Sequence, residues 1–206
     1  MTLKYLMLCS IGAIAAFVTP ASATPVTYST TTSQLCIGAS GCGATSQTFA
    51  GIVNVTFDPI TSSVQSPSFG SFGTLVVSCL GGGTACSDVS LTGLNLYLNI
   101  VETAPGSGSG GIPVGQISGS ISGTFSSASI VWGNPSATTI TAGGSSVTYS
   151  VTQTTLGLVP PSTNSGQTTI QAQIVDNATT PEPTSLILFG TGFLAFGIIA
   201  KARRPK

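Results

Sequence analysis

The feature that most constrains the fold of this 206-residue chain is a regular alternation of apolar and hydroxyl-bearing side chains. Across residues 117–126, isoleucine, glycine and phenylalanine alternate with serine and threonine. Successive side chains of a β-strand point to opposite faces of a sheet, so this pattern predicts one strand with a buried and a solvated face. The same alternation recurs at residues 94–100, 147–151 and 170–174. These segments predict a protein built from sheets.

Shorter strands are expected between clusters of glycine and proline. The candidates are residues 52–57, with 47–51 leading into them, 75–79 and 129–132. Val89 and Leu91 are out of phase with the set that begins at Leu94, which predicts a bulge or bend at Gly93. Turns are predicted at residues 58–59, 66–67, 81–83, 105–111, 133–135, 143–144 and 160–166. About eight strands at this spacing, without any helical apolar stripe, favour an all-β fold, an antiparallel β-sandwich of Greek-key or jelly-roll type.

The first 23 residues read as a secretory signal peptide. Lys4 precedes an apolar stretch at 5–18, and Pro20 precedes the small residues Ala21 and Ala23. We expect the Sec export machinery to recognise this segment and cleavage to follow Ala23. Cys9 lies inside the apolar stretch and is expected to leave with it. The exported domain is then residues 24–180, long enough for one domain with a sizeable core.

The exported domain has almost no groups that titrate. No lysine or arginine lies between Lys4 and Lys201, and the chain contains no histidine. The domain's four acids, which give it a formal charge of −4, are Asp58, Asp88, Glu102 and Asp176. Nucleic acid is not an expected partner, because binding to phosphates depends on basic side chains.

The same composition excludes most catalytic mechanisms. A Ser-His-Asp triad cannot form, and a cysteine nucleophile would have no base to activate it. A pair of carboxylates could still serve a glycosidase, although such clefts are usually lined by aromatic residues and Trp132 is the only tryptophan. We expect no enzymatic activity and no cofactor. A calcium site using Asp58, Asp88 or Asp176 is left open, the alternative being that these acids lie in turns and aid solubility.

Four cysteines remain after removal of the signal peptide. Cys36 and Cys42 lie in one glycine-rich segment, and Cys79 and Cys86 flank three glycines in another. The spacing does not fit a zinc site, and export favours disulfides. We predict two local bridges, Cys36 to Cys42 and Cys79 to Cys86, with two cross-bridges between the loops as the alternative.

The last 26 residues combine a rigid motif, an apolar run and a basic end. Pro181, Glu182 and Pro183 form an extended, accessible segment, because each proline restricts itself and the residue before it. Residues 185–200 carry no charge and would span about 24 Å as a helix, near the lower limit for a bilayer. The basic side chains that follow are Lys201, Arg203, Arg204 and Lys206, which would stay on the cytoplasmic side.

This arrangement resembles the PEP-CTERM sorting signal of exported bacterial proteins. Pro181, Glu182 and Pro183 match its motif, residues 186–200 its span, and Lys201, Arg203 and Arg204 its basic end, while Thr180 stands where valine is frequent. The resemblance covers residues 181–206 only. It implies recognition by an exosortase, a membrane-embedded protease or transpeptidase. An ordinary one-span anchor is the main alternative, and a C-terminal core helix fits poorly because the run is apolar on all sides.

These observations lead to two functional hypotheses. The first is a noncatalytic, exported structural or adhesive component of a biofilm or floc polysaccharide matrix. Before processing it would be anchored in the inner membrane with its body in the periplasm, and afterwards it would lie at the cell surface or in the matrix. The second is a carbohydrate-binding module using hydroxyls, Asn, Tyr and Trp132. Ice binding is a weaker variant, since the threonine run at residues 30–32 is too short for a regular array.

Overall fold

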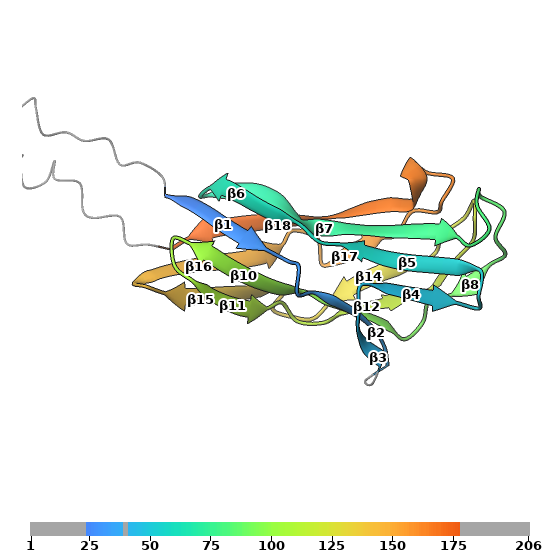
Figure 1. Cartoon of the computed structure of the whole chain (residues 1–206), viewed down its shortest axis with the longest axis horizontal. Helices are drawn as coiled ribbons and strands as arrows, with labels where there is room; N and C mark the ends of the chain where they lie inside the picture. The colour runs from blue at the N-terminus through green and yellow to red at the C-terminus, as the bar shows by residue number, and fades with distance from the viewer. Residues whose placement is uncertain (1–23, 39–40, 178–206) are drawn as a thin grey trace, which may run out of the picture. The chain divides into compact units, whose positions relative to one another are not determined.

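A computed structural model of the chain describes residues 24–38 and 41–177 (Figure 1). The described part consists of antiparallel strands, with one 3-10 helix, Asn164–Gly166, as its only helix. None of its residues forms a helix capable of crossing a membrane. The predicted all-β fold is confirmed. The predicted signal peptide at 1–23 and membrane helix at 185–200 lie outside the described residues.

The strands form three larger sheets and one small pair. The four-stranded sheet has the order β11 (Gly108–Gly111), β10 (Asn99–Ala104), β1 (Pro25–Ser29), β6 (Thr61–Gln65). The β9 sheet has the order β17 (Thr155–Gly157), β14 (Ser129–Trp132), β12 (Gly115–Ser118), β9 (Leu94–Tyr97), β2 (Gln34–Ile37), β3 (Gly41–Ala44). The β18 sheet has the order β15 (Ala137–Ala142), β16 (Ser145–Val151), β18 (Gln167–Asp176), β7 (Ser68–Cys79), β5 (Val53–Asp58), β4 (Ser46–Phe49). The pair is β13 (Ser120–Ile121) with β8 (Val89–Ser90).

One hydrophobic core joins these sheets in a β-sandwich-like arrangement. Tyr28 of β1 packs against Phe72 of β7 and Tyr149 of β16, with ring centroids 6.0 and 5.7 Å apart. These contacts hold the four-stranded sheet against the β18 sheet, and the inward residues of the β9 sheet belong to the same core. The described residues form eighteen strands, more than the eight or so expected from the pattern. Residues 94–100 and 117–126 each form two strands, and several weakly apolar strands carry no alternation that could be recognised. A Greek-key or jelly-roll order stays a prediction.

The clearest alternating segments form the strands that they predict. Val147, Tyr149 and Val151 are buried along β16, and the inward side chains of β18 are buried in the same way. The apolar set from Leu94 to Ile100 is also buried, although it is divided between β9 and β10. The expected bend at Gly93 is present, where φ is +91°. A positive φ favours glycine, so the glycine at this position correctly predicts where the alternation of apolar residues changes phase.

Residues 117–126 do not form the single strand that their alternation predicts. The chain bends at Gly119, where φ is +99°, and only β12 and the short β13 are extended. A turn follows, in which the Ser122 amide donates to the Phe125 carbonyl over 2.8 Å. Phe125 therefore lies outside the core with 62% of its surface exposed. Glycine permits the bend that ends the alternation.

The predicted turn at residues 105–111 contains a strand. β11 pairs with β10 and packs its glycines directly on β15 of the other layer. A β-carbon on Gly108 would lie 2.8 Å from Ile140 Cγ2, and one on Gly110 would lie 2.8 Å from Thr138 Oγ1. The two layers approach this closely because the glycines have no side chain. The glycines that suggested a turn instead allow the edge strand β11 to pack closely on β15.

Candidate functional site

The first and last described strands meet at one turn. Pro25 at the start of β1 lies opposite Gln65 in β6, and the neighbouring Ser66 Oγ accepts a hydrogen bond from the Asp176 backbone amide. Asn177 is the last described residue. The described body therefore begins and ends beside the Ser66 turn.

The four cysteines form two local bridges in the structure. Cys36 bonds to Cys42 with their Cα atoms 4.3 Å apart, and Cys79 bonds to Cys86 with a Cα separation of 5.5 Å. This is the pairing that the spacing predicts, and the cross-bridged alternative is absent. Cys36 is fully buried beside the core, whereas Cys42 is exposed. Both pairs are disulfide-bonded and each closes a short loop beside a strand, which is a structural arrangement.

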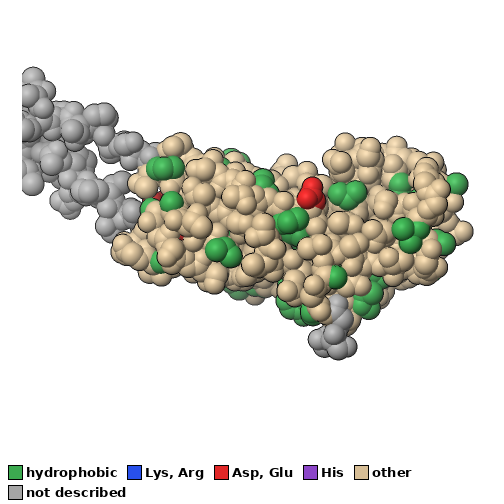
Figure 2. Space-filling view, viewed as in Figure 1, with side chains coloured by type: hydrophobic (Ala, Val, Ile, Leu, Met, Phe, Trp, Pro, Cys, Tyr) green, Lys and Arg blue, Asp and Glu red, His purple; other side chains and the backbone are tan. Residues whose placement is uncertain are grey.

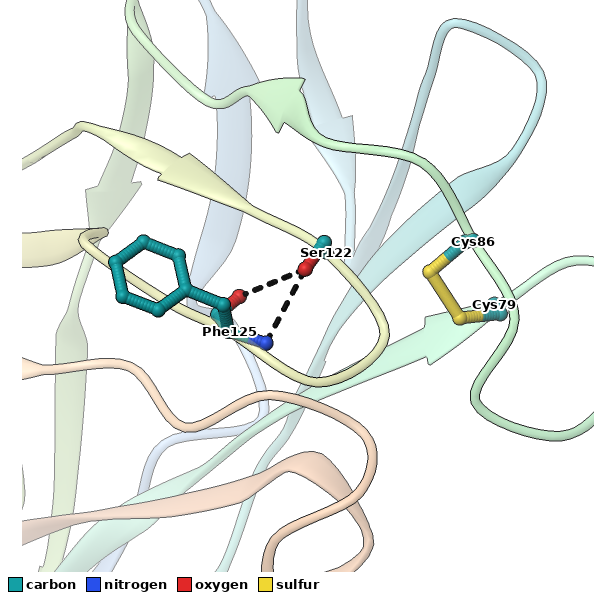
Figure 3. Close-up of a disulfide and its surroundings, with 4 residues drawn as sticks. All are labelled: Cys79, Cys86, Ser122 and Phe125. Atoms are coloured by element: carbon teal, nitrogen blue, oxygen red, sulfur yellow. Dashed lines mark hydrogen bonds between the residues drawn. A yellow bond between two sulfur atoms is a disulfide. The ribbon is translucent and has the colours of Figure 1, made fainter.

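The loop closed by Cys79 and Cys86 packs against the turn that follows β13 (Figure 3). The Gly123 amide donates to the Cys86 carbonyl over 3.1 Å, and a β-carbon on Gly123 would lie 1.5 Å from the Thr84 carbonyl oxygen. Ser122 Oγ bonds to both the amide and the carbonyl of Phe125, which closes the turn. This contact fixes the loop at the far end of β7 from the Ser66 turn.

Glu102 is a buried acid whose environment the sequence analysis did not identify. It is 1% exposed, its Oε2 accepts a 2.7 Å hydrogen bond from the Tyr149 hydroxyl, and its Oε1 accepts one from the Gly106 amide. One signal was available, because Glu102 continues the inward phase of Leu98 and Ile100. Enclosed between two layers, the carboxyl joins β10 to β16 and is not presented to a substrate.

Burial raises the pKa of two core tyrosines, Tyr28 and Tyr149. The pKa of Tyr149 is raised far above its usual value, mainly by removal from water and then by the hydrogen bond and negative charge of Glu102. Burial also raises the pKa of Tyr28, against the opposing effect of hydrogen bonds with Ser62 and the Ser71 carbonyl. Both phenols therefore stay protonated at physiological pH and act as donors.

The remaining acids are not brought together. Asp58 at the end of β5 and Asp88 before β8 are exposed, while Asp176 lies at the end of β18 and accepts from Ser145. Over residues 24–38 and 41–177, no three His, Cys, Asp or Glu side chains gather as a metal site would require. The structure thus supplies no described cluster for the calcium site that the sequence left open.

Trp132 lies in the core and not on a binding surface. It is 5% exposed in β14, and a β-carbon on Gly115 would lie 2.8 Å from its Cζ3 atom. Its indole N–H has no hydrogen-bond partner among the described residues. The suggestion that Trp132 contacts a sugar is wrong, because the alternation places Ile130 and Trp132 on the buried face of the strand.

The surface is almost uncharged. Figure 2 shows a face made mainly of backbone and uncharged, non-hydrophobic side chains, with hydrophobic side chains in small separate areas and few acidic atoms. Among the large hydrophobic side chains of the described part, those that stay exposed are Ile37, Phe69, Leu80, Tyr97, Phe125 and Val131. Phe69 is the most exposed of these at 73%.

Comparison with known proteins identifies the tail. A family model described as the PEP-CTERM protein-sorting motif matches residues 179–204, while neither a curated protein nor a solved structure matches the chain. The molecule is therefore an exported protein with an all-β body, anchored in the membrane before processing. More particularly, it carries a PEP-CTERM signal and is sorted by an exosortase.

The individual residues predicted to direct export and sorting lie outside the described part of the structure. They are Ala21 and Ala23 at the expected signal cleavage site, Pro181, Glu182 and Pro183 in the motif, and Lys201, Arg203, Arg204 and Lys206 at the basic end. The matched range includes the three motif residues and Lys201, Arg203 and Arg204, and it ends before Lys206. Their assignment rests on sequence.

Proposed function

We propose that the protein is a noncatalytic structural or adhesive component of an extracellular polysaccharide matrix in a biofilm or floc. The observation that carries this proposal is the combination of a PEP-CTERM signal with a disulfide-bonded, all-β body. The body exposes hydroxyls and carboxamides and has no basic side chain among its described residues. Such a surface suits contact with a hydroxyl-rich matrix.

The proposed route has three steps. The signal peptide at 1–23 directs export, the helix at 185–200 holds the protein in the inner membrane with its body in the periplasm, and an exosortase then processes the tail. The released body, an antiparallel sandwich, reaches the cell surface or the matrix. Its bridges fit this route, because disulfides persist in oxidising compartments outside the cytoplasm.

Absence of catalysis is part of the proposal. The described acids do not converge, and the buried Glu102 is bonded to Tyr149 and Gly106. A general acid or base must reach the proton that it transfers, and Glu102 is enclosed in the core. A structural or adhesive role requires none of this chemistry.

Deletion of the gene tests the proposal in the bacterium that makes the protein. The expected result is reduced cell aggregation and reduced retention of matrix polysaccharide, with recovery on expression of the wild-type chain. Expression of the Glu182→Ala chain is the matched control, because it supplies the same β body without the complete sorting motif, and it should fail to restore aggregation. Unchanged aggregation and matrix in the deletion strain would contradict the proposal.

A second candidate function is carbohydrate binding by the β body itself. The observation favouring it is the exposed Phe69 ring, which lies beside polar side chains of β18 on one face of the β18 sheet. This function would give the protein an attachment point in the matrix.

A further inference from the structure

The outer face of β18 carries a row of exposed carboxamides. Gln167, Gln171 and Gln173 alternate with buried residues along the strand, so their side chains point to the same side. None of these three side chains has a hydrogen-bond partner among the described residues. Alternate residues on a strand are about 7 Å apart. Gln171 and Gln173 occupy adjacent positions of this face, whereas Thr169 lies between Gln167 and Gln171, so the face presents free carboxamide donors and acceptors interrupted by one hydroxyl.

An exposed aromatic ring lies beside this row. Phe69 of β7 is opposite Gln173 in the strand register, and Gln173 is opposite Ser150 of β16. Two residues further along β7, Ser71 is opposite Gln171. Residues opposite each other in a sheet share a face, so the ring and two carboxamides are neighbours. Phe69 is 73% exposed, so it lacks most of the favourable free energy that burial of a phenylalanine side chain provides.

Charge restricts what this face can bind. Phe69, Gln171 and Gln173 are flanked by uncharged positions, including Ser71, Ser150 and Val175. The described residues contain no Lys, Arg or His to attract an anion, and their four acids give the body a formal charge of −4. An acidic polysaccharide would be repelled by this net charge, whereas a neutral one would not.

We propose that Phe69, Gln171 and Gln173 form a binding site for a neutral polysaccharide. The ring covers the apolar C–H face of one sugar, and the carboxamides exchange hydrogen bonds with hydroxyl groups of the chain. A glutamine side chain both donates and accepts, which matches the hydroxyl group. An open sheet face suits an extended polymer that runs across several strands. This site rests on the proposed matrix function and gives it a ligand class.

Affinity electrophoresis tests the site with the full-length protein in mild detergent. Native gels contain hydroxyethyl cellulose, galactomannan or dextran as neutral probes, or alginate as the anionic probe. We expect retardation by at least one neutral polymer. The basic residues 201–206 of the full-length chain can bind alginate, so any retardation by alginate should be the same for wild type and Phe69→Ala. Phe69→Ala and Gln173→Ala should each weaken retardation about tenfold, through loss of stacking or of a hydrogen bond. Phe125→Ala is the matched control, because it removes an aromatic ring that is 62% exposed elsewhere, and it should bind as the wild type does.

Several results would overturn the site. They are absence of retardation by all three neutral polymers, retardation by alginate alone, unchanged binding of Phe69→Ala, or equal loss in Phe125→Ala. Size-exclusion chromatography in which Phe69→Ala converts a dimer to a monomer would instead assign the face to a second copy of the chain. An unchanged melting temperature verifies that each variant is folded. Failed binding together with a matrix defect in the deletion strain removes this site alone, whereas an unchanged matrix removes the proposed function.

Discussion

Replacement of Tyr149 by phenylalanine tests the buried contact between the two layers. The change keeps the ring, and thus its packing against Tyr28, but removes the donor that lies 2.7 Å from Glu102 Oε2. Glu102 is 1% exposed, so water cannot replace the lost partner without rearrangement. Leaving a buried polar group without a partner costs about 1–3 kcal/mol, and more if the group is charged. We expect the free energy of unfolding to fall by about 2 kcal/mol.

Urea denaturation measures this change, with the emission of Trp132 as the probe. Trp132 is the only tryptophan and is 5% exposed, so unfolding transfers it from the core to water. Tyr97→Phe is the matched control, because it also removes one phenol hydroxyl but at a side chain that is 40% exposed, at the end of β9. Its effect should stay within about 0.5 kcal/mol. Equal stability of Tyr149→Phe and Tyr97→Phe would show that the hydrogen bond between Tyr149 and Glu102 does not stabilise the fold.

The same pair of variants has a defined pH dependence. The pKa of Tyr149 is raised in the folded protein, so above about pH 10 the unfolded chain loses its tyrosine proton first. The stability contributed by the protonated phenol is complete below that pH and decreases as the pH rises above it. Wild-type protein should therefore lose stability more steeply than Tyr149→Phe in alkaline urea titrations. A parallel loss in both proteins would contradict the assigned burial of Tyr149.

Three further predictions concern the loop closed by Cys79 and Cys86 and the pairing of the four cysteines. Gly123→Ala should destabilise the protein by more than about 2 kcal/mol, because its new methyl group would overlap the Thr84 carbonyl. Gly157 has open space around it, so Gly157→Ala is the control and should change stability by less than about 1 kcal/mol. Equal melting temperatures for the two variants would contradict this packing. Replacing Cys79 and Cys86 together by serine should cost about 2–3 kcal/mol, since the bridge restricts the unfolded chain. Peptide mapping without reductant should recover both local bridges in the wild type, and four free thiols in the mature protein would contradict them.

Strong local patterns allowed much of the fold to be predicted. β16 and β18 follow from uninterrupted alternation, and the short spacing of the cysteines identifies both bridges. Strands with few apolar residues were not predicted, because the prediction depends on a strong alternation. β6 contains Val64 as its only hydrophobic residue, and β11 contains only glycine and serine, so neither carries an alternation that could be recognised. Their extension depends on backbone pairing with β1 and β10.

Contacts between residues far apart in the sequence account for the other features that the sequence did not predict. Glu102 and Tyr149 are separated by 47 positions, and their hydrogen bond exists because the two layers place them face to face. Phe69 and Gln173 become neighbours only through the register of β7 with β18. Phe125 shows the opposite case, since its local phase predicts burial and the bend at Gly119 places it at the surface. A one-dimensional pattern identifies strands but not which side chains meet across them.

Intact mass and cell fractionation of the endogenous protein test directly whether the PEP-CTERM tail sorts this β body. Wild type and Glu182→Ala are compared, and intact mass suits a body without Lys or Arg, which trypsin cannot cut. We expect the wild type to have lost residues 186–206 and to be found at the surface or in the medium, and Glu182→Ala to stay in the membrane at the mass that includes the tail. Retention of the tail by both proteins in the inner membrane would contradict sorting by the tail.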